Sequence, residues 1–141
     1  MGDDALASAI PTGLLREPGL IGIGIDAVDI ERFEVVLSRT PSVSGRIFSD
    51  SECVDGDGRP RSTRSLAARF AAKEAVMKVL GVGIFGVPLA QIEVIGGGSA
   101  APELVLAGSA HDAAEAASIR RWQVSLTHTD DIAIAVAAGL S

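Results

Sequence analysis

Apolar and polar residues alternate along the first regular segment of the chain. In residues 20–26, L-I-G-I-G-I-D, an extended backbone places the isoleucines on one face and the glycines with Asp26 on the other. The alternation predicts a strand, with Asp26 near its end on a face that carries no large side chain. Residues 1–19 contain two prolines and keep no period. We therefore expect an N-terminal extension over residues 1–19 and a single domain over residues 20–141.

Apolar residues at helical spacing follow in three segments. Residues 30–37 show this spacing, with Asp29 suited to the first turn and Pro41 closing the segment. The alanine-rich residues 66–80 predict a long helix that Gly81 ends, and its possible N-caps are Ser62, Thr63 and Ser65. Residues 109–119 predict a further alanine-rich helix, with Ser109 as a possible cap.

The remaining segments alternate again and predict two pairs of strands. Residues 91–95 and 103–107 enclose a loop and predict a hairpin, while residues 122–126 and 132–138 are joined by a short polar segment. Charged residues and glycines fill residues 49–62, which predicts a mobile loop. The pattern as a whole indicates an α+β domain in which a largely antiparallel sheet packs against the long helix.

The charge of the chain is acidic on average but uneven. Its 141 residues hold 12 Lys and Arg against 18 Asp and Glu, a formal net charge of −6. This balance argues against nucleic acid and against a membrane surface as partners. Residues 32–78 nevertheless hold nine basic and six acidic residues, which puts this third at +3 and the remainder at −9. A local site for phosphate therefore remains compatible with the composition.

The sequence also indicates a compartment. Cys53 is the only cysteine, so no disulfide can form within the chain. Apolar stretches are shorter than the roughly 18 residues that a membrane span needs, and the N-terminus has no basic start of the secretory kind. We expect a cytoplasmic protein.

Glu74 lies on the apolar side of the predicted long helix, which leaves two interpretations open. In the first, Glu74 forms a salt bridge with Lys78, since glutamate four residues before lysine is the favourable order, and Asp26 caps the following helix. In the second, Glu74 and Asp26 are ligands of Mg²⁺, which favours carboxylates together with waters and phosphate oxygens.

Three cations on the same helix, Arg69, Lys73 and Lys78, precede Gly81. Beside a metal site, cations at this spacing indicate a polyphosphate ligand. Without a metal they form a solvated basic face.

Two other motifs carry less weight. Residues 22–27 fit the dinucleotide fingerprint G-x-G-x-x-A, but isoleucines alternate through the glycines and no parallel crossover follows. Ser125, His128 and Asp130 suggest a nucleophilic triad, yet no nucleophile elbow surrounds the serine. A hydrolase that uses Ser125 and His128 is retained as a third hypothesis.

Three motifs together resemble one family. G-I-G-I-D-A-V-D-I-E-R-F (residues 22–33), A-A-R-F-A-A-K-E-A-V-M-K-V-L-G (67–81) and V-S-L-T-H-T (124–129) resemble the holo-[acyl-carrier-protein] synthases in order and spacing. These are small phosphopantetheinyl transferases, and the similarity spans about residues 20–138. The resemblance implies the 4′-phosphopantetheinyl transferase fold and transfer of the phosphopantetheine arm of coenzyme A to a serine of an apo acyl carrier protein, with release of adenosine 3′,5′-bisphosphate.

The resemblance also implies roles for single residues. Asp26 and Glu74 match Mg²⁺ ligands, and Glu74, directly or through a metal-held water, is a candidate base. His128 is a second candidate catalytic residue, matching a position at the coenzyme. The positions that match the coenzyme cleft, or that lie beside it as cations, are Asp26, Arg69, Lys73, Lys78, Gly81, Pro102, His128 and Thr129.

Assembly and carrier docking are implied in the same way. Members of this family form homotrimers with sites between subunits, and Pro102, His128 and Thr129 match positions that reach the coenzyme from the neighbouring subunit. Arg32 matches the position that docks the carrier protein, and Arg39 follows seven residues later. Carrier proteins are acidic, so the arginines are expected to speed the encounter in a salt-dependent way.

The sequence departs from the family at three positions. Ala101 stands where a cation is usual, Val82 where threonine is frequent and Met77 where serine is frequent. We expect each change to loosen contacts with the coenzyme phosphates, so that coenzyme affinity is either weaker or is supplied by Arg61 or Arg64 instead. A non-catalytic module that binds coenzyme A or a nucleotide is therefore the rival hypothesis.

Overall fold

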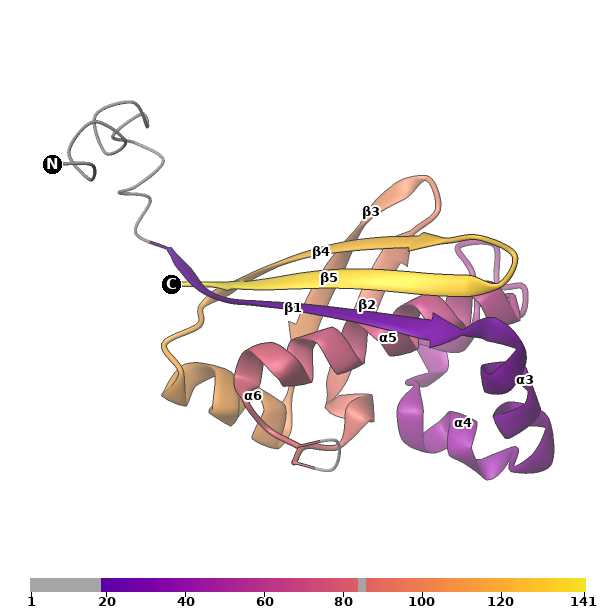
Figure 1. The fold of residues 1–141 in the computed structure, drawn as a ribbon, viewed down its shortest axis with the longest axis horizontal. Coiled ribbons are helices and arrows are strands. Elements are labelled where there is room, and N and C mark those ends of the chain that lie inside the picture. Colours follow the sequence, from indigo (N-terminus) through magenta and orange to yellow (C-terminus); the bar gives the residue numbers. More distant parts are fainter. Residues whose placement is uncertain (1–18, 84–85) are drawn as a thin grey trace, which may run out of the picture.

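A computed structural model of the chain describes residues 19–83 and 86–141 (Figure 1). The extension predicted for residues 1–19 lies outside the described residues, except for Gly19. Three strands form one antiparallel sheet in the order β1-β5-β4: β1 (Leu20–Asp29), β4 (Arg121–His128) and β5 (Ile132–Leu140). In its register, Ala135 of the central strand faces Asp26 on one side and Leu126 on the other. The strands predicted at these positions are confirmed.

The long helix α5 (Thr63–Leu80) lies against this sheet, as predicted. The side chain of Ser62 caps it by accepting a hydrogen bond from the Ser65 backbone amide, and Gly81 ends it in the left-handed conformation with φ 67°. Helix and central strand meet through alanines that are fully buried: Ala71, Ala72, Ala75, Ala133, Ala135 and Ala137. Small side chains allow the close approach of backbone to backbone that positions the site.

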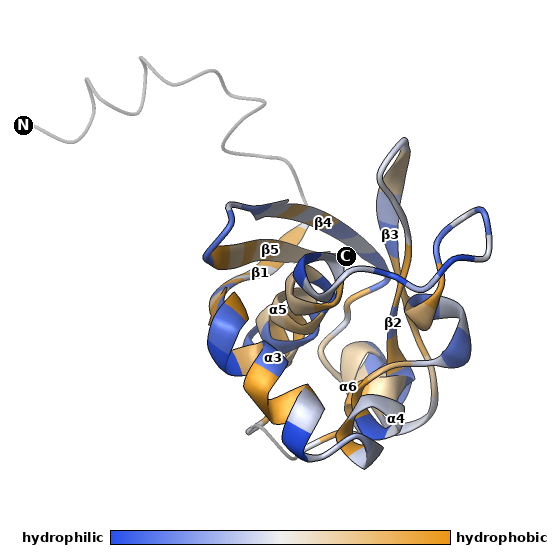
Figure 2. Ribbon diagram, turned by 90° about the vertical axis from the view of Figure 1, so that its right-hand side faces the viewer, coloured by the Kyte–Doolittle hydropathy of each residue, from blue (hydrophilic) through white to orange (hydrophobic). Residues whose placement is uncertain are grey.

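A separate two-stranded sheet is the predicted hairpin of β2 (Ile92–Gly97) and β3 (Ala100–Leu106). Figure 2 shows α5 beneath the three-stranded sheet with this hairpin to one side. Helix α6 (Gly108–Ala116) follows. Ser109 does not cap it, which corrects the prediction: Ala107 occupies the N-cap position and the Ser109 hydroxyl donates to Gln91 Oε1 at 2.8 Å.

Two helices and two 3₁₀ turns complete the described chain: α3 (Ile30–Arg39), α4 (Ser42–Ile47), η1 (Asp50–Cys53) and η2 (Leu89–Gln91). Asp29 caps α3 by accepting from the Arg32 amide at 2.9 Å, so Asp26 is not the cap. The segment predicted as a mobile loop, residues 49–62, contains η1 and a bridge between Val54 and Pro60. Its Glu52 is buried, which ties this segment to the core.

The outer face of the three-stranded sheet is apolar and exposed. Ile23 and Ile25 of β1 are 66% and 60% exposed, and Ile132 and Ile134 of β5 continue the same face. The strand alternation of the sequence is therefore confirmed, but it is the glycine face, not the isoleucine face, that packs on α5.

Candidate active site

Gly24 brings β1 into direct contact with α5. A Cβ atom at this position would overlap the carbonyl oxygen of Ala75, so only glycine allows the strand to lie so close to the helix. Asp26 follows on the same face of β1, and Glu74 precedes Ala75 on α5. The contact therefore brings together two carboxylates that are 48 residues apart in the sequence.

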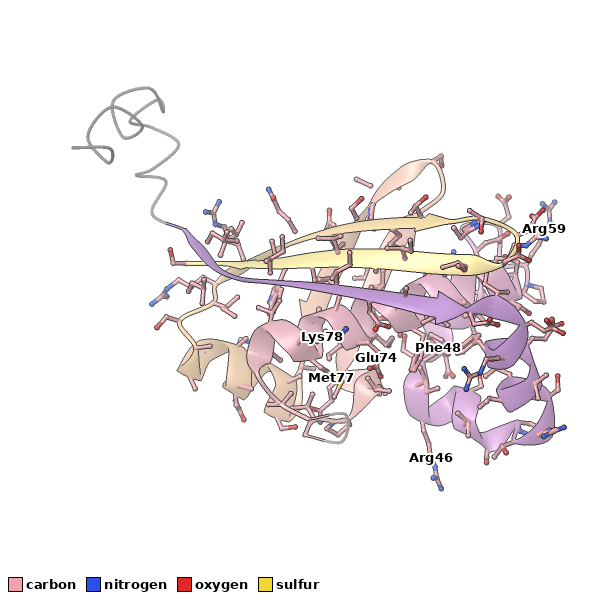
Figure 3. All side chains as sticks on the ribbon, in the orientation of Figure 1. Arg46, Phe48, Arg59, Glu74, Met77 and Lys78 are labelled. Carbon is pink, nitrogen blue, oxygen red and sulfur yellow. The ribbon has the colours of Figure 1, made fainter. Side chains whose placement is uncertain are left out.

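Asp26 and Glu74 line one cavity of about 440 Å³ between β1, α3 and α5. Phe33, Val36 and Phe70 give it apolar walls, and Arg32 lies at its side. Glu74 and Lys78 are labelled on α5 in Figure 3, close beneath β1. The sequence-predicted pair of carboxylates thus shares a partly apolar groove that opens beside an arginine.

Lys78 binds Asp26, not Glu74. Its Nζ lies 3.2 Å from Asp26 Oδ1 and donates to the Ile25 carbonyl oxygen at 2.7 Å. The salt bridge between Glu74 and Lys78, one of the two interpretations of the sequence, is therefore not formed. Burial raises the pKa of Glu74, the negative charge of Asp26 raises it further, and the Lys78 charge offsets part of this shift.

The two carboxylates suit a hard divalent cation. Asp26 and Glu74 offer oxygen ligands, and a bound cation would offset the repulsion between their two negative charges. Within residues 19–83 and 86–141, no cluster of three or more His, Cys, Asp or Glu side chains is placed to hold a metal. Two protein ligands fit Mg²⁺, which keeps several waters and substrate phosphate oxygens in its coordination sphere.

Lys73 does not reach this groove, which corrects its prediction as a cation beside the metal. Its side chain is fully buried, and its Nζ lies 2.6 Å from Glu52 Oε1. Lys73 and Glu74 are consecutive on the helix, so their side chains leave it about 100° apart. The ammonium group of Lys73 therefore lies in the protein interior, where it contacts η1, and not beside Asp26 and Glu74.

Arg69 is also buried, with 2% of its surface exposed. It donates to Ser65 Oγ at 3.1 Å and to the Gly96 carbonyl oxygen in the hairpin turn. Burial and the positive charge of Arg61 lower the pKa of Arg69 to about 10, still far above neutrality. Arg69 holds the hairpin to α5, and its Nε has no hydrogen-bond partner among the described residues.

The residues expected to reach the coenzyme from a neighbouring subunit lie elsewhere on the chain. His128, at the end of β4, is exposed, and its Nδ1 is 3.2 Å from the Thr129 carbonyl oxygen. His128 lines a separate cavity with Arg64 and Asp130, and Pro102 lines another on the outer face of the sheet. One chain by itself does not bring Pro102, His128 or Thr129 to the carboxylate pair.

The hydrolase hypothesis is contradicted by the strand. Ser125 and His128 are three residues apart on β4, so they project from opposite faces of the sheet. They line different cavities. No general base is placed beside the Ser125 hydroxyl by this arrangement.

The remaining predicted site residues, Gly81, Arg32 and Arg39, lie on the surface, at the end of α5 and on α3. Gly81 caps α5 and is exposed at the helix end, one turn beyond Lys78. Arg32 lines the carboxylate groove, whereas Arg39 is exposed in the last turn of α3. None of the helices in the described parts of the chain is both long and apolar enough to cross a membrane.

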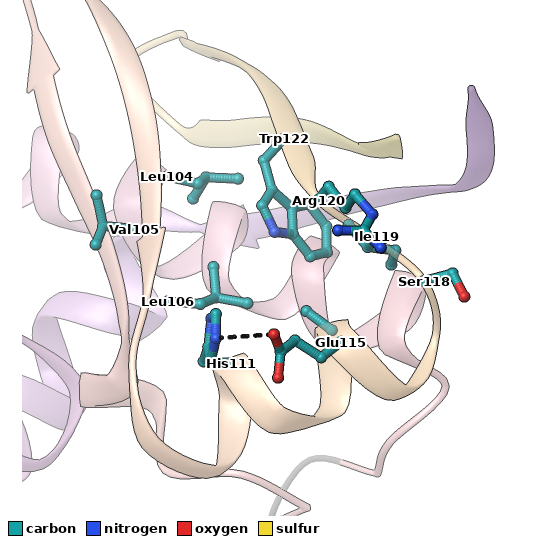
Figure 4. A pocket seen from close by; sticks show the side chains of 10 residues that line it. Leu104, Val105, Leu106, His111, Glu115, Ser118, Ile119, Arg120 and Trp122 are labelled. Carbon is teal, nitrogen blue, oxygen red and sulfur yellow. Dashed lines mark ion pairs between the residues drawn. The ribbon is translucent and has the colours of Figure 1, made fainter. Parts of the chain in front are cut away.

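A further cavity of about 480 Å³ lies between β3, α6 and β4, away from the carboxylate pair (Figure 4). Trp122 and Arg120 line it together with His111, whose Nε2 is 3.6 Å from Glu115 Oε1 on the next turn of α6. Both members of this pair are more than half exposed, so His111 is a surface residue.

Sequence reasoning missed Glu52. The S-x-x-E pattern of residues 49–52 is a capping box, and both of its hydrogen bonds are formed in η1. This local signal predicts a turn, but the pairing of Glu52 with Lys73, 21 residues later, has no local signature.

Comparison with known proteins identifies the class. A family model described as the 4′-phosphopantetheinyl transferase superfamily matches residues 22–137, so the chain belongs to this superfamily. Two relatives named holo-[acyl-carrier-protein] synthase are similar over most of their length. The one from Salinispora arenicola is 41% identical, covering 83% of this chain and 95% of the relative, and the one from Streptomyces coelicolor is 43% identical, covering 83% and 94%.

Solved structures agree with this assignment. A Helicobacter pylori holo-[acyl-carrier-protein] synthase in complex with coenzyme A has a TM-score of 0.69 and 32% identity, covering 84% of this chain and 99% of that one. The enzyme of the same name from Neisseria meningitidis has a TM-score of 0.74 and 28% identity, covering 85% and 98%. The α+β fold expected from the resemblance is thereby confirmed.

Proposed function

We propose that this chain is a Mg²⁺-dependent holo-[acyl-carrier-protein] synthase. It transfers 4′-phosphopantetheine from coenzyme A to a serine of an apo acyl carrier protein, or of a carrier domain in a fatty acid synthase, and releases adenosine 3′,5′-bisphosphate. The observation that carries this proposal is the shared groove of Asp26 and Glu74 with Lys78 beside it. The similarity to enzymes of this name over 83% of the chain supports it.

The chemistry follows from the charges in the groove. The serine oxygen attacks the phosphorus that carries pantetheine, the bond to the bridging oxygen breaks, and adenosine 3′,5′-bisphosphate leaves with the electron pair. Asp26 and Glu74 would hold Mg²⁺, which would supply positive charge to offset the negative charge of the pyrophosphate oxygens. Lys78 is 55% exposed at its side chain, so its ammonium group can turn from Asp26 to a phosphate oxygen.

Glu74 is the proposed base for the serine proton, directly or through a water. Its pKa is raised by burial and by Asp26, which makes the carboxylate a stronger base than one in open water. His128 remains a proposed orienting residue for phosphate or ribose, because it lies outside the carboxylate groove of its own chain.

The split site supports assembly as a homotrimer. Pro102, His128 and Thr129 complete a coenzyme site in this proposal only when a neighbouring subunit supplies them. The exposed isoleucine face of β1 and β5 provides an apolar surface for that contact. Gly81 and Arg69 are assigned to the coenzyme side of the cleft, Arg69 acting through the hairpin turn that it holds.

Arg32 and Arg39 are proposed to dock the acidic carrier. Both are exposed on α3, and Arg32 lies at the carboxylate groove, where the serine must arrive. Attraction between these cations and an acidic partner raises the encounter rate and weakens with salt. A cytoplasmic location fits the single thiol, Cys53, and is part of the same proposal.

The test is transfer to an apo carrier. Incubation with coenzyme A, Mg²⁺ and apo acyl carrier protein is expected to add about 340 Da to the carrier by mass spectrometry, the mass of the phosphopantetheine arm. Removal of Mg²⁺ with a chelator is expected to abolish this mass gain of the carrier. No gain with any carrier of a panel that includes fatty acid synthase domains contradicts the proposal.

The rival is a module that binds coenzyme A without transfer. Ala101 in β3 and Val82 after α5 favour it, since each lacks a polar group that the family resemblance leads us to expect there. Calorimetry separates the two: tight binding of coenzyme A without any mass gain on carriers supports the module, and mass gain excludes it.

A further inference from the structure

The ion pair of Glu52 and Lys73 is buried and has no part in the mechanism proposed above. Their side chains are 1% and 0% exposed, and Lys73 Nζ lies 2.6 Å from Glu52 Oε1. Burial lowers the pKa of Lys73, and the Glu52 carboxylate offsets part of that shift. A charged pair with no access to solvent or ligand calls for a role inside the protein.

The pair joins α5 to three other segments. Glu52 accepts hydrogen bonds from the amides of Ser49 at 3.1 Å and Val94 at 3.0 Å. Lys73 donates to the Leu89 carbonyl oxygen at 3.1 Å, and its Nζ lies 5.3 Å from the centre of the Phe48 ring. One face of the helix is thus bonded to η1, to η2 and, through Glu52, to β2.

Stability alone is a weak reason for such a pair. Taking two charges out of water is costly, and apolar replacements of similar shape are often neutral or stabilising. Hydrogen bonds, however, demand direction, whereas apolar contacts do not. A buried lysine bonded on two sides favours those rotations of the helix in which its Nζ reaches both oxygen atoms.

That rotation matters because Lys73 immediately precedes Glu74. On the opposite side, β1 meets α5 at Gly24 without an intervening side chain, so that contact supplies closeness but no hydrogen bond to fix the angle. One turn earlier, Arg69 bonds the Gly96 carbonyl oxygen on the same side as Lys73. On the groove side, the directional contacts of α5 near Glu74 are those of Lys78, whose side chain is more than half exposed. The buried directional contacts, those of Arg69 and Lys73, are made by the face that points away from the groove.

We propose that Glu52 and Lys73 are positioning residues that fix the rotation of α5, and so aim Glu74 at Asp26. This inference rests on the proposed function for its kinetic consequence, but its structural consequence is independent of that function. Loss of the pair is expected to displace Glu74 even where the protein stays folded.

The test replaces the pair with neutral side chains of similar shape, Glu52→Gln with Lys73→Met. The double variant is expected to keep a Tm within about 5 °C of the parent, while kcat for carrier modification falls at least about tenfold. In the metal-free protein, nuclear Overhauser contacts between Gly24 and Ala75 are expected to weaken. A purely structural pair would leave both kcat and these contacts unchanged at temperatures well below Tm.

Ile119→Ala is the matched control. Ile119 is buried against Gly139, four residues along β5 from the partner of Asp26, at a point that Val79 of α5 also contacts. Its truncation therefore lowers Tm through apolar packing and removes no hydrogen bond of α5. If the double variant loses as much Tm as Ile119→Ala, a kcat below that of Ile119→Ala supports the positioning role, and an equal kcat overturns it. Unchanged Gly24–Ala75 contacts overturn it in either case. If the parent modifies no carrier, the proposed function fails, and the same contacts still decide this inference.

Discussion

Single residues decide the geometry of the carboxylate groove. Gly24 allows β1 to touch α5, and Asp26 and Glu74 then share a cavity with Lys78 bonded to Asp26. Burial and the negative charge of Asp26 raise the pKa of Glu74, and Lys78 offsets only part of this shift, so the ionised Glu74 is unfavourable when no metal ion is present. Function and folding stability are therefore opposed at Glu74.

Glu74→Gln is expected to stabilise the metal-free protein while abolishing transfer. The pKa of Glu74 is raised in the folded state, so its ionisation costs folding free energy once the pH exceeds the unfolded pKa. Removing the charge is expected to raise stability by up to about 1 kcal/mol at about pH 7 and to change it little at about pH 3.5. Thermal unfolding at the two pH values and the carrier mass assay measure these effects. A lower Tm at neutral pH, or retained turnover, contradicts the assignment.

Secondary-structure elements followed their local sequence signals closely. The alanine-rich run, Ser62 and Gly81 predict α5 because propensity and caps act within a few residues. The same reasoning cannot find Lys73 with Glu52, or Lys78 with Asp26, since those partners are 21 and 52 residues apart. The sequence identified Asp26 and Glu74 as a pair, but it misplaced Lys73, because helical spacing gives a face and not what lies against it.

The end of α6 shows an element at odds with its sequence. Ser118 has φ 60°, a conformation that favours glycine, because the amides of Ser118 and Ile119 bond back to Glu115 and Ala114, both at 2.9 Å. Ser118→Gly is expected to stabilise the protein by about 0.5–1 kcal/mol, which thermal unfolding measures as a rise in Tm. Ala113→Gly, within the helix, is the control and is expected to lower Tm. A fall in Tm for Ser118→Gly refutes the strained cap.

At the scale of the whole molecule, the isoleucine face of the sheet remains to be covered. Ile21, Ile23 and Ile25 of β1 and Ile132 and Ile134 of β5 are all at least 37% exposed. Ile25 pairs with Val136, two residues from Ile134 on the same face of β5, which joins the two groups. A contiguous apolar face of this kind is unusual on a protein that stays monomeric. The proposed homotrimer would bury such a face and would also bring residues of one chain to the groove of another.

Ile23→Asp is expected to break the homotrimer. Ile23 is the most exposed isoleucine of the face. A carboxylate at this position would be buried without a partner at the subunit contact, and the free energy of its desolvation would oppose assembly. Light scattering is expected to give the mass of a trimer for the parent and of a monomer for the variant, with carrier modification lost. Val35→Asp, at an exposed position of α3, is the control and is expected to remain trimeric. A monomeric parent that still modifies carriers refutes the split site.

The contact at Gly24 limits how this protein can vary over evolutionary time. The isoleucine face of β1 can accept any apolar side chain of suitable size, so many substitutions are possible there. At Gly24, the smallest possible addition, one methyl group, meets a main-chain oxygen that no change of rotamer can move. Substitutions between apolar residues are thus tolerated on one face of β1, whereas substitution of Gly24 is excluded on the other. The face with Gly24 is the one that brings Asp26 and Glu74 together.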